Sequence, residues 1–314
     1  MPKEQQEELT VEEKEKLLSK LEEQGKNKWF KRWQNHMAVP KSINIFSTEK
    51  KEQERVLRYL LLRVLINQQA RFEKVREMCI QVCEEFSSLL FDKPYEVSES
   101  RLFQVFRNVA GQKGASLYKV GMLGGIKPAS LFAYRFKAYE GFIRWLEEHN
   151  LTLFEVIIKR LKEEGVRGLF SFLSTHQVLE AGWVGSDPKA CRMFVNWVVF
   201  LLNEIWEQKV AEMTETLMIV DGHVGKVFCR TGLLDTVMYE GRRPFIIQAS
   251  KMRAKIEKIV HDFHKIPFYV DNGAFYLFED GYCTDLEPQC GECPVGDICK
   301  KHTKWTAYAQ HKEN

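Results

Sequence analysis

The sequence predicts an all-α protein built from two helical domains. Apolar residues recur at steps of three and four along much of the chain, which is the spacing of one buried helix face. Strand-like alternation of apolar and polar residues is weak throughout, and residues that interrupt helices are sparse, with 19 Gly and 9 Pro among 314 residues. Long helices joined by loops therefore fit this sequence better than a fold of strands and turns.

The helical pattern becomes strong at Val56. From there, Val56, Leu60 and Val64 follow one another on successive turns of a first helix. The same periodicity predicts further helices over 72–90, 100–110, 130–148, 151–164, 168–180 and 188–206.

These elements suggest three parts of the chain. Residues 1–27 are highly charged with few apolar points, which predicts a charged arm, either a frayed amphipathic helix or disordered. Residues 56–205 are expected to form a six-helix domain. Residues 28–55 are expected to join 206–314 in a second helical domain, which carries a cluster of cysteines.

The composition, with 45% hydrophobic and 28% charged residues, is that of an ordinary globular protein. The N-terminus lacks the apolar run of a secretory signal, and the longest uninterrupted apolar stretch, Trp197–Leu202, is about a third of a membrane span. Eight cysteines without an export signal favour reduced thiols or metal ligands over disulfides. We therefore expect a cytoplasmic monomer without a membrane partner. The net charge of +3 permits a nucleic-acid partner but does not argue for one.

A short turn bounded by Gly182 and Gly185 lies between two predicted helices. Ser186 and Asp187 are both competent N-caps for the second helix, and Pro188 suits its first position. Helix, glycine-bounded turn and helix form the outline of a hairpin that can offer backbone N–H groups to a phosphate.

Four cysteines near the C-terminus follow the spacing C-x6-C-x2-C-x5-C. They are Cys283, Cys290, Cys293 and Cys299. Four thiolates within seventeen residues can converge on one metal centre if the loop wraps around it. The chemistry of the ligands allows either tetrahedral zinc or a [4Fe–4S] cluster.

A second motif runs from Ile219 to Arg230. An apolar pair precedes Asp221, and His223, Lys226 and Arg230 follow it down a predicted helix. An aspartate in front of a helix is usually an N-cap. It can also stabilise the positive charge that develops on a sugar when a glycosidic bond breaks.

Together, the cysteine spacing and the Asp221 segment resemble the helix-hairpin-helix superfamily of DNA glycosylases. The cysteines are similar to the iron–sulfur loop of endonuclease III and of the adenine-specific mismatch glycosylases, so the resemblance implies a [4Fe–4S] cluster. It also implies that Asp221 is catalytic and that His223, Lys226 and Arg230 contact DNA. The hairpin glycines, Gly182 and Gly185, are implied to do the same.

The resemblance extends to two further places in the chain. Lys189 lies where lyase-competent members carry a lysine that attacks the sugar and forms a Schiff base; the alternative is a solvated lysine of the first helical turn. Gln69, with Gln68 as second choice, lies in a segment similar to the one whose glutamine fills the space left by a flipped nucleotide. A polar helix end is the alternative there.

The expected function is therefore excision of a damaged base from double-stranded DNA, with strand cleavage by β-elimination if Lys189 acts as a nucleophile. Two alternatives remain at this stage. One is a monofunctional glycosylase that uses Asp221 and water, and the other is a non-catalytic iron–sulfur DNA-binding protein. The sequence does not indicate which damaged base is removed.

Overall fold

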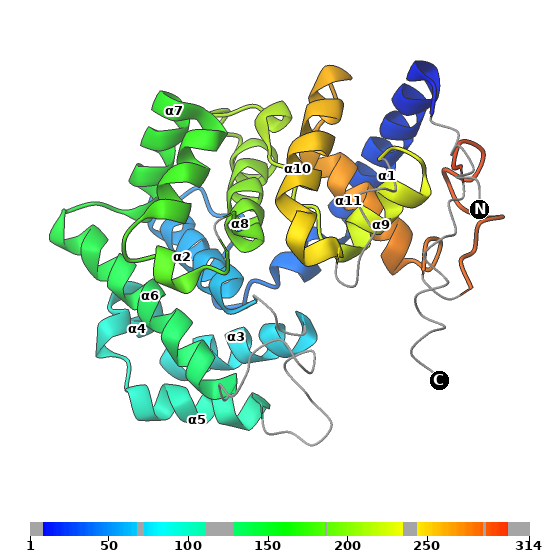
Figure 1. Ribbon diagram of the computed structural model, residues 1–314. Coiled ribbons are helices and arrows are strands. Elements are labelled where there is room, and N and C mark those ends of the chain that lie inside the picture. Colours follow the sequence, from blue (N-terminus) through cyan, green and yellow to red (C-terminus); the bar gives the residue numbers. More distant parts are fainter. Residues whose placement is uncertain are drawn as a thin grey trace. The chain divides into compact units, whose positions relative to one another are not determined.

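The computed structural model describes residues 9–67, 72–110, 128–185, 187–234, 244–284 and 287–300. Within these ranges the protein is helical and contains no strand, which confirms the predicted all-α class (Figure 1). The principal helices are α1 (Val11–Met37), α2 (Lys50–Ile66), α3 (Phe72–Phe86), α4 (Leu89–Asp92), α5 (Glu99–Ala110), α6 (Pro128–Glu148), α7 (Leu153–Thr175), α8 (Lys189–Phe200), α9 (Gly222–Arg230), α10 (Pro244–Asp262) and α11 (Pro267–Glu279). Among the described helices, none combines the length and the apolar character needed to cross a bilayer.

The chain divides into two compact units. The first unit comprises residues 1–33 and 213–314, and the second comprises residues 34–212. This division differs from the sequence-based one at the N-terminal side. Of the described residues, 34–55 group with the 56–205 region, and 9–33 group with the C-terminal part of the chain.

Helix α1 covers the described part of the predicted charged arm, and of the two predicted alternatives it agrees with the amphipathic helix, which is packed and not frayed. Leu17, Leu18 and Leu21 are fully buried in the core of the first unit. Backbones meet closely there: a Cβ atom on Gly25 would lie 1.8 Å from the carbonyl oxygen of Tyr269 in α11. A few leucines at helical spacing therefore dock a helix whose other faces are charged, and that pattern is easily mistaken for a solvated arm.

Helix α2 forms the centre of the second unit, where it packs against α3, α6, α7 and α8. Its predicted apolar face is buried, but so are side chains on its other faces, including Tyr59, Leu62 and Arg63. The α2 residue Glu54 accepts hydrogen bonds from the backbone N–H groups of Leu153 (3.0 Å) and Phe154 (2.7 Å). These contacts join α2 to the start of α7, where orphan N–H groups require acceptors.

Helix α7 contains an internal kink where the sequence predicts two separate helices. Gly165 has a φ of 69°, a conformation that glycine adopts without steric cost. Thr152 and Glu155 form a capping box that starts the helix. The predicted interruption between residues 164 and 168 is therefore a change of direction and not a loop.

Helix α8 starts one residue later than its sequence suggests. Pro188 occupies the N-cap position, and no side chain caps the helix. Asp187 instead accepts a hydrogen bond from Nε of Arg192 at 2.7 Å. The helix then ends in a π turn over Leu201–Ile205, close to the predicted end.

Candidate functional site

Asp221 caps the N-terminus of α9. Its Oδ1 accepts hydrogen bonds from the backbone N–H groups of His223 (2.9 Å) and Val224 (3.0 Å). These bonds satisfy two donors of the first turn, and the positive end of the helix dipole favours the ionised carboxylate. The side chain is partly exposed, so a half-buried anion is held in a defined orientation at the helix start. The capping and catalytic interpretations are compatible with this geometry.

His223 and Lys226 share an aromatic neighbour, Phe278 of α11. The rings of His223 and Phe278 stack with centroids 3.8 Å apart at 27°. The ammonium nitrogen of Lys226 lies 5.9 Å from the Phe278 centroid, within the range of a cation–π contact. Both predicted DNA-contact residues are partly exposed. Sequence reasoning missed Phe278, since an apolar residue of α11 carries no chemical signal of its own.

Arg230, a predicted DNA contact, is hydrogen-bonded to the cysteine loop. It is 8% exposed. Its Nη1 donates to the carbonyl oxygens of Cys283 (2.7 Å) and Thr284 (2.9 Å), and it lies 3.8 Å from Cys283 Sγ. The thiol of Cys299 lies 3.4 Å from the carbonyl oxygen of Arg230 itself. The guanidinium thus ties the last turn of α9 to the cysteine loop, and its contact with DNA stays a prediction.

The four thiols of the cysteine loop are partly exposed and form no disulfide. A Cβ atom on Gly296 would lie 2.7 Å from the carbonyl oxygen of Cys290 and 3.1 Å from that of Cys293, so the loop folds tightly over this glycine. Burial raises the pKa of the Cys293 thiol, and the nearby Cys283 and Cys290 raise it further, although a backbone hydrogen bond from Val295 opposes them.

The loop suits a sulfur-ligated metal in some respects only. Cys283 and Cys290 lie near enough to Cys293 to raise the pKa of its thiol. Cys283 and Cys299 both contact Arg230. Within the described ranges, however, no group of three or more His, Cys, Asp or Glu residues is arranged to hold a metal ion. The donor chemistry and the folding of the loop therefore fit a four-thiolate centre, while the ligand geometry is not formed.

Helix α1 contacts the same loop. Asp297 lies 2.7 Å from Nζ of Lys20 and 3.1 Å from Nζ of Lys16, and Lys20 also donates to the carbonyl oxygen of Pro294 at 3.0 Å. Hydrogen bonds from Lys20 and then Lys16 lower the pKa of Asp297 to about 2. These ion pairs are exposed, so they orient the loop more than they stabilise it.

The hairpin lies in the second unit, and its two glycines have different roles. A Cβ atom on Gly182 would lie 2.8 Å from Ala138 Cβ and 2.9 Å from Leu65 Cδ2, so this glycine lets the turn pack closely against both α2 and α6. Gly185 has a φ of 81°, and a Cβ atom there would meet nothing within 4 Å. It is exposed and serves the turn itself.

Lys189 is the first residue of α8 and is exposed. It belongs to the second unit, as do Gly182 and Gly185, whereas Asp221 belongs to the first. Gln68 and Gln69 lie outside the described residues. The structure thus brings the Asp221 motif together with the cysteine loop, and it brings Lys189 together with the hairpin.

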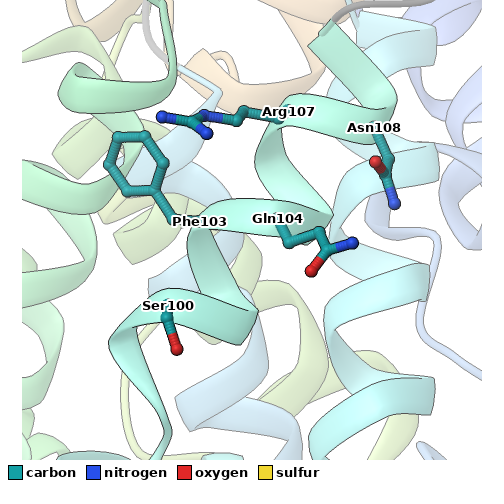
Figure 2. A pocket seen from close by; sticks show the side chains of 5 residues that line it. All are labelled: Ser100, Phe103, Gln104, Arg107 and Asn108. Carbon is teal, nitrogen blue, oxygen red and sulfur yellow. The ribbon is translucent and has the colours of Figure 1, made fainter.

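A separate hollow of about 520 Å³ lies along α5 in the second unit (Figure 2). The guanidinium of Arg107 lies over the ring of Phe103, 4.9 Å from its centroid. The other described lining residues are Ser100, Gln104 and Asn108. Sequence reasoning did not identify this hollow, because a polar face of one helix is indistinguishable in sequence from ordinary solvated surface.

Comparison of the chain with protein families, with curated proteins and with solved structures finds no match in any of the three.

Proposed function

We propose that this protein is a DNA glycosylase that removes a damaged base from double-stranded DNA. The observation that carries the proposal is the arrangement around α9. Asp221 is the N-cap of this helix, and Arg230, its last residue, is hydrogen-bonded to the cysteine loop. The two motifs that resemble the glycosylase superfamily are therefore joined by one nine-residue helix.

The chemistry of base excision explains the need for a carboxylate at Asp221. Breaking an N-glycosidic bond places positive charge on the sugar, and a fixed carboxylate stabilises that charge. The two backbone hydrogen bonds to Oδ1 keep the group oriented before substrate arrives, which lowers the cost of reorganisation during the reaction. Asp221 can also accept a proton from the water that attacks the sugar.

The other predicted site residues would hold the cofactor or contact DNA. Cys283, Cys290, Cys293 and Cys299 would hold the proposed [4Fe–4S] cluster. When bound, the cluster would supply a cross-link between the two ends of the loop. Lys226 is proposed to bind a DNA phosphate, with His223 beside it on α9. The turn at Gly185 is proposed to donate backbone N–H groups to another phosphate. Gln69 or Gln68 is proposed to fill the duplex when the target nucleotide is flipped.

The exposure of Lys189 favours a second candidate, a monofunctional glycosylase. Nucleophilic lysines are activated by removal from solvent or by a neighbouring cation. Lys189 is exposed in the first turn of α8. In this version Asp221 and water release the base, and strand cleavage requires another agent.

A panel of duplexes, each with one damaged base, tests the proposal. A glycosylase converts at least one of them into a product that breaks in hot alkali, and a glycosylase with lyase activity breaks it without alkali. Binding without any cleavage, with or without alkali, would instead support the non-catalytic DNA-binding protein. Undamaged duplex of the same sequence is the control.

A further inference from the structure

The chain reaches Asp221 through a buried segment that is not helical. Residues 216–220 are all buried and belong to no helix. Buried backbone N–H groups require hydrogen-bond acceptors. In a sheet a neighbouring strand would provide them, but the described part of this protein has no strand.

Side chains of α10 and α11 provide the acceptors instead. The N–H of Met218 donates to Oε1 of Glu257 in α10 at 3.0 Å. The N–H of Val220 donates to Oδ1 of Asp271 in α11 at 3.1 Å. Met218 and Val220 are alternate residues of this segment.

A third contact, made by a side chain and not by a backbone N–H, lies at the start of the segment. The hydroxyl of Thr216 accepts a hydrogen bond from the N–H of Phe268, in the first turn of α11, at 3.1 Å. Residues 216, 218 and 220 are therefore each attached to α10 or α11, and the last attachment is one residue before Asp221. The segment is fixed at regular intervals up to the carboxylate.

The two carboxylate acceptors are almost completely buried, which is unusual for charged side chains. Asp271 is 5% exposed and Glu257 is 4% exposed. A buried carboxylate costs free energy unless strong hydrogen bonds compensate for lost water. An apolar side chain would pack at either place without that cost, but it could not accept a hydrogen bond from the N–H groups of Met218 or Val220.

We propose that Asp271 and Glu257 are positioning residues that set the location of the Asp221 carboxylate. This inference rests on the proposed catalytic role of Asp221. Asp271 acts one residue before Asp221, and Asp221 itself holds the first turn of α9, so a shift at Val220 moves the carboxylate relative to the helix. A displacement of about 1 Å can cost a reaction roughly a hundredfold in rate.

The test compares Asp271→Ala with Asp271→Asn in the full chain. The alanine variant loses the acceptor, and its single-turnover rate of base release should fall about ten- to a hundredfold while affinity for lesion-containing DNA stays within about threefold. The asparagine variant keeps a carbonyl oxygen and should recover to within about threefold of the wild-type rate. Asp271→Leu, which fills the site without an acceptor, replaces Asp271→Ala if the latter does not fold.

Glu22 provides a matched control in the same unit. Its Oε1 accepts a hydrogen bond from the N–H of Ile266 at 2.7 Å, just before α11, whereas Asp271 accepts from Val220 directly before Asp221. Glu22→Ala should lower stability without changing the rate of base release. Equal rate losses in Glu22→Ala and Asp271→Ala, or a wild-type rate in Asp271→Ala, would overturn the positioning role.

Amide hydrogen exchange separates this inference from the proposed function. The N–H groups of His223 and Val224 are bonded to Asp221 Oδ1, so their protection reports the orientation of this carboxylate even without catalysis. Asp271→Ala should reduce that protection at least tenfold, and Asp271→Asn should retain it. If the wild type releases no base from any duplex, the proposed function fails, whereas unchanged protection in Asp271→Ala refutes the positioning itself.

Discussion

The starts of α8 and α9 carry the two candidate catalytic residues, and they are built differently. At the start of α9, Asp221 is bonded to two backbone N–H groups and follows a buried segment. At the start of α8, Pro188 is the N-cap without a side-chain bond, and exposed Lys189 follows an exposed turn at Gly185. A precise catalytic group needs a surrounding structure that restricts it. The comparison therefore favours Asp221 as the main catalytic group.

The largest expected effect comes from Asp221→Asn. The amide removes the charge, so base release should fall by roughly two to four orders of magnitude while lesion binding is nearly unchanged. Asparagine is also a good N-cap, so the fold should be retained. Single-turnover kinetics and thermal unfolding measure the two effects. A near-normal rate of base release in the folded variant would show that Asp221 caps α9 but is not catalytic.

In the cysteine loop, Cys293→Ser should prevent the protein from binding the proposed cluster. The wild-type protein should be brown and contain iron, with visible absorption that disappears on acidification as thiolates are protonated. The serine variant should lose that absorption and expose residues 213–300 to protease before residues 34–212. Iron and zinc analysis decides the identity of the metal. One zinc and no iron would contradict the proposed cluster.

Arg230→Gln tests the link between α9 and the cysteine loop. The shorter amide cannot reproduce the bonds to the carbonyl oxygens of Cys283 and Thr284, so the free energy of unfolding should drop by about 1–3 kcal/mol. Iron should also leave faster in the presence of a chelator. Arg32→Gln, which removes surface ion pairs with Glu279 and Asp280, is a control with a smaller expected loss. A larger loss in the control would contradict the assigned role.

Lys189→Gln should change the rate of base release by less than about threefold, because the side chain is exposed at the start of α8. Borohydride reduction of the wild-type reaction distinguishes the two versions of the mechanism. A crosslink to DNA that Lys189→Gln abolishes would establish the lyase. A crosslink that survives in this variant would identify another amine as the nucleophile.

The smallest effect is expected from Lys226→Gln on the exposed side of α9. If the ammonium neutralises one phosphate, its loss should reduce the slope of log K against log salt by about 0.9. Binding measured over a range of salt concentrations gives this slope. An unchanged slope would show that Lys226 contacts Phe278 but does not bind a DNA phosphate.

Local patterns in the sequence were sufficient for the helical class and for most helix positions. Apolar spacing predicts α5, α6 and the start of α8 within a few residues, because a buried face must recur at the helical period, but α2 starts six residues before the predicted Val56 and α7 joins two predicted helices. The cap at Asp221 also follows from local chemistry. The same reasoning did not predict that residues 11–27 pack into a core, since a few leucines can dock a charged helix once another surface is available.

The sequence by itself determined the all-α class, the four clustered cysteines and the aspartate at a helix start, because these depend on residue type and short spacing. Only the tertiary structure decided what those residues touch. It buried Arg230 against the cysteine loop, brought Phe278 beneath His223, and attached the segment before Asp221 to Asp271. Each of these contacts joins residues about fifty positions apart in the sequence, and such a pairing depends on how helices pack, which no local pattern contains.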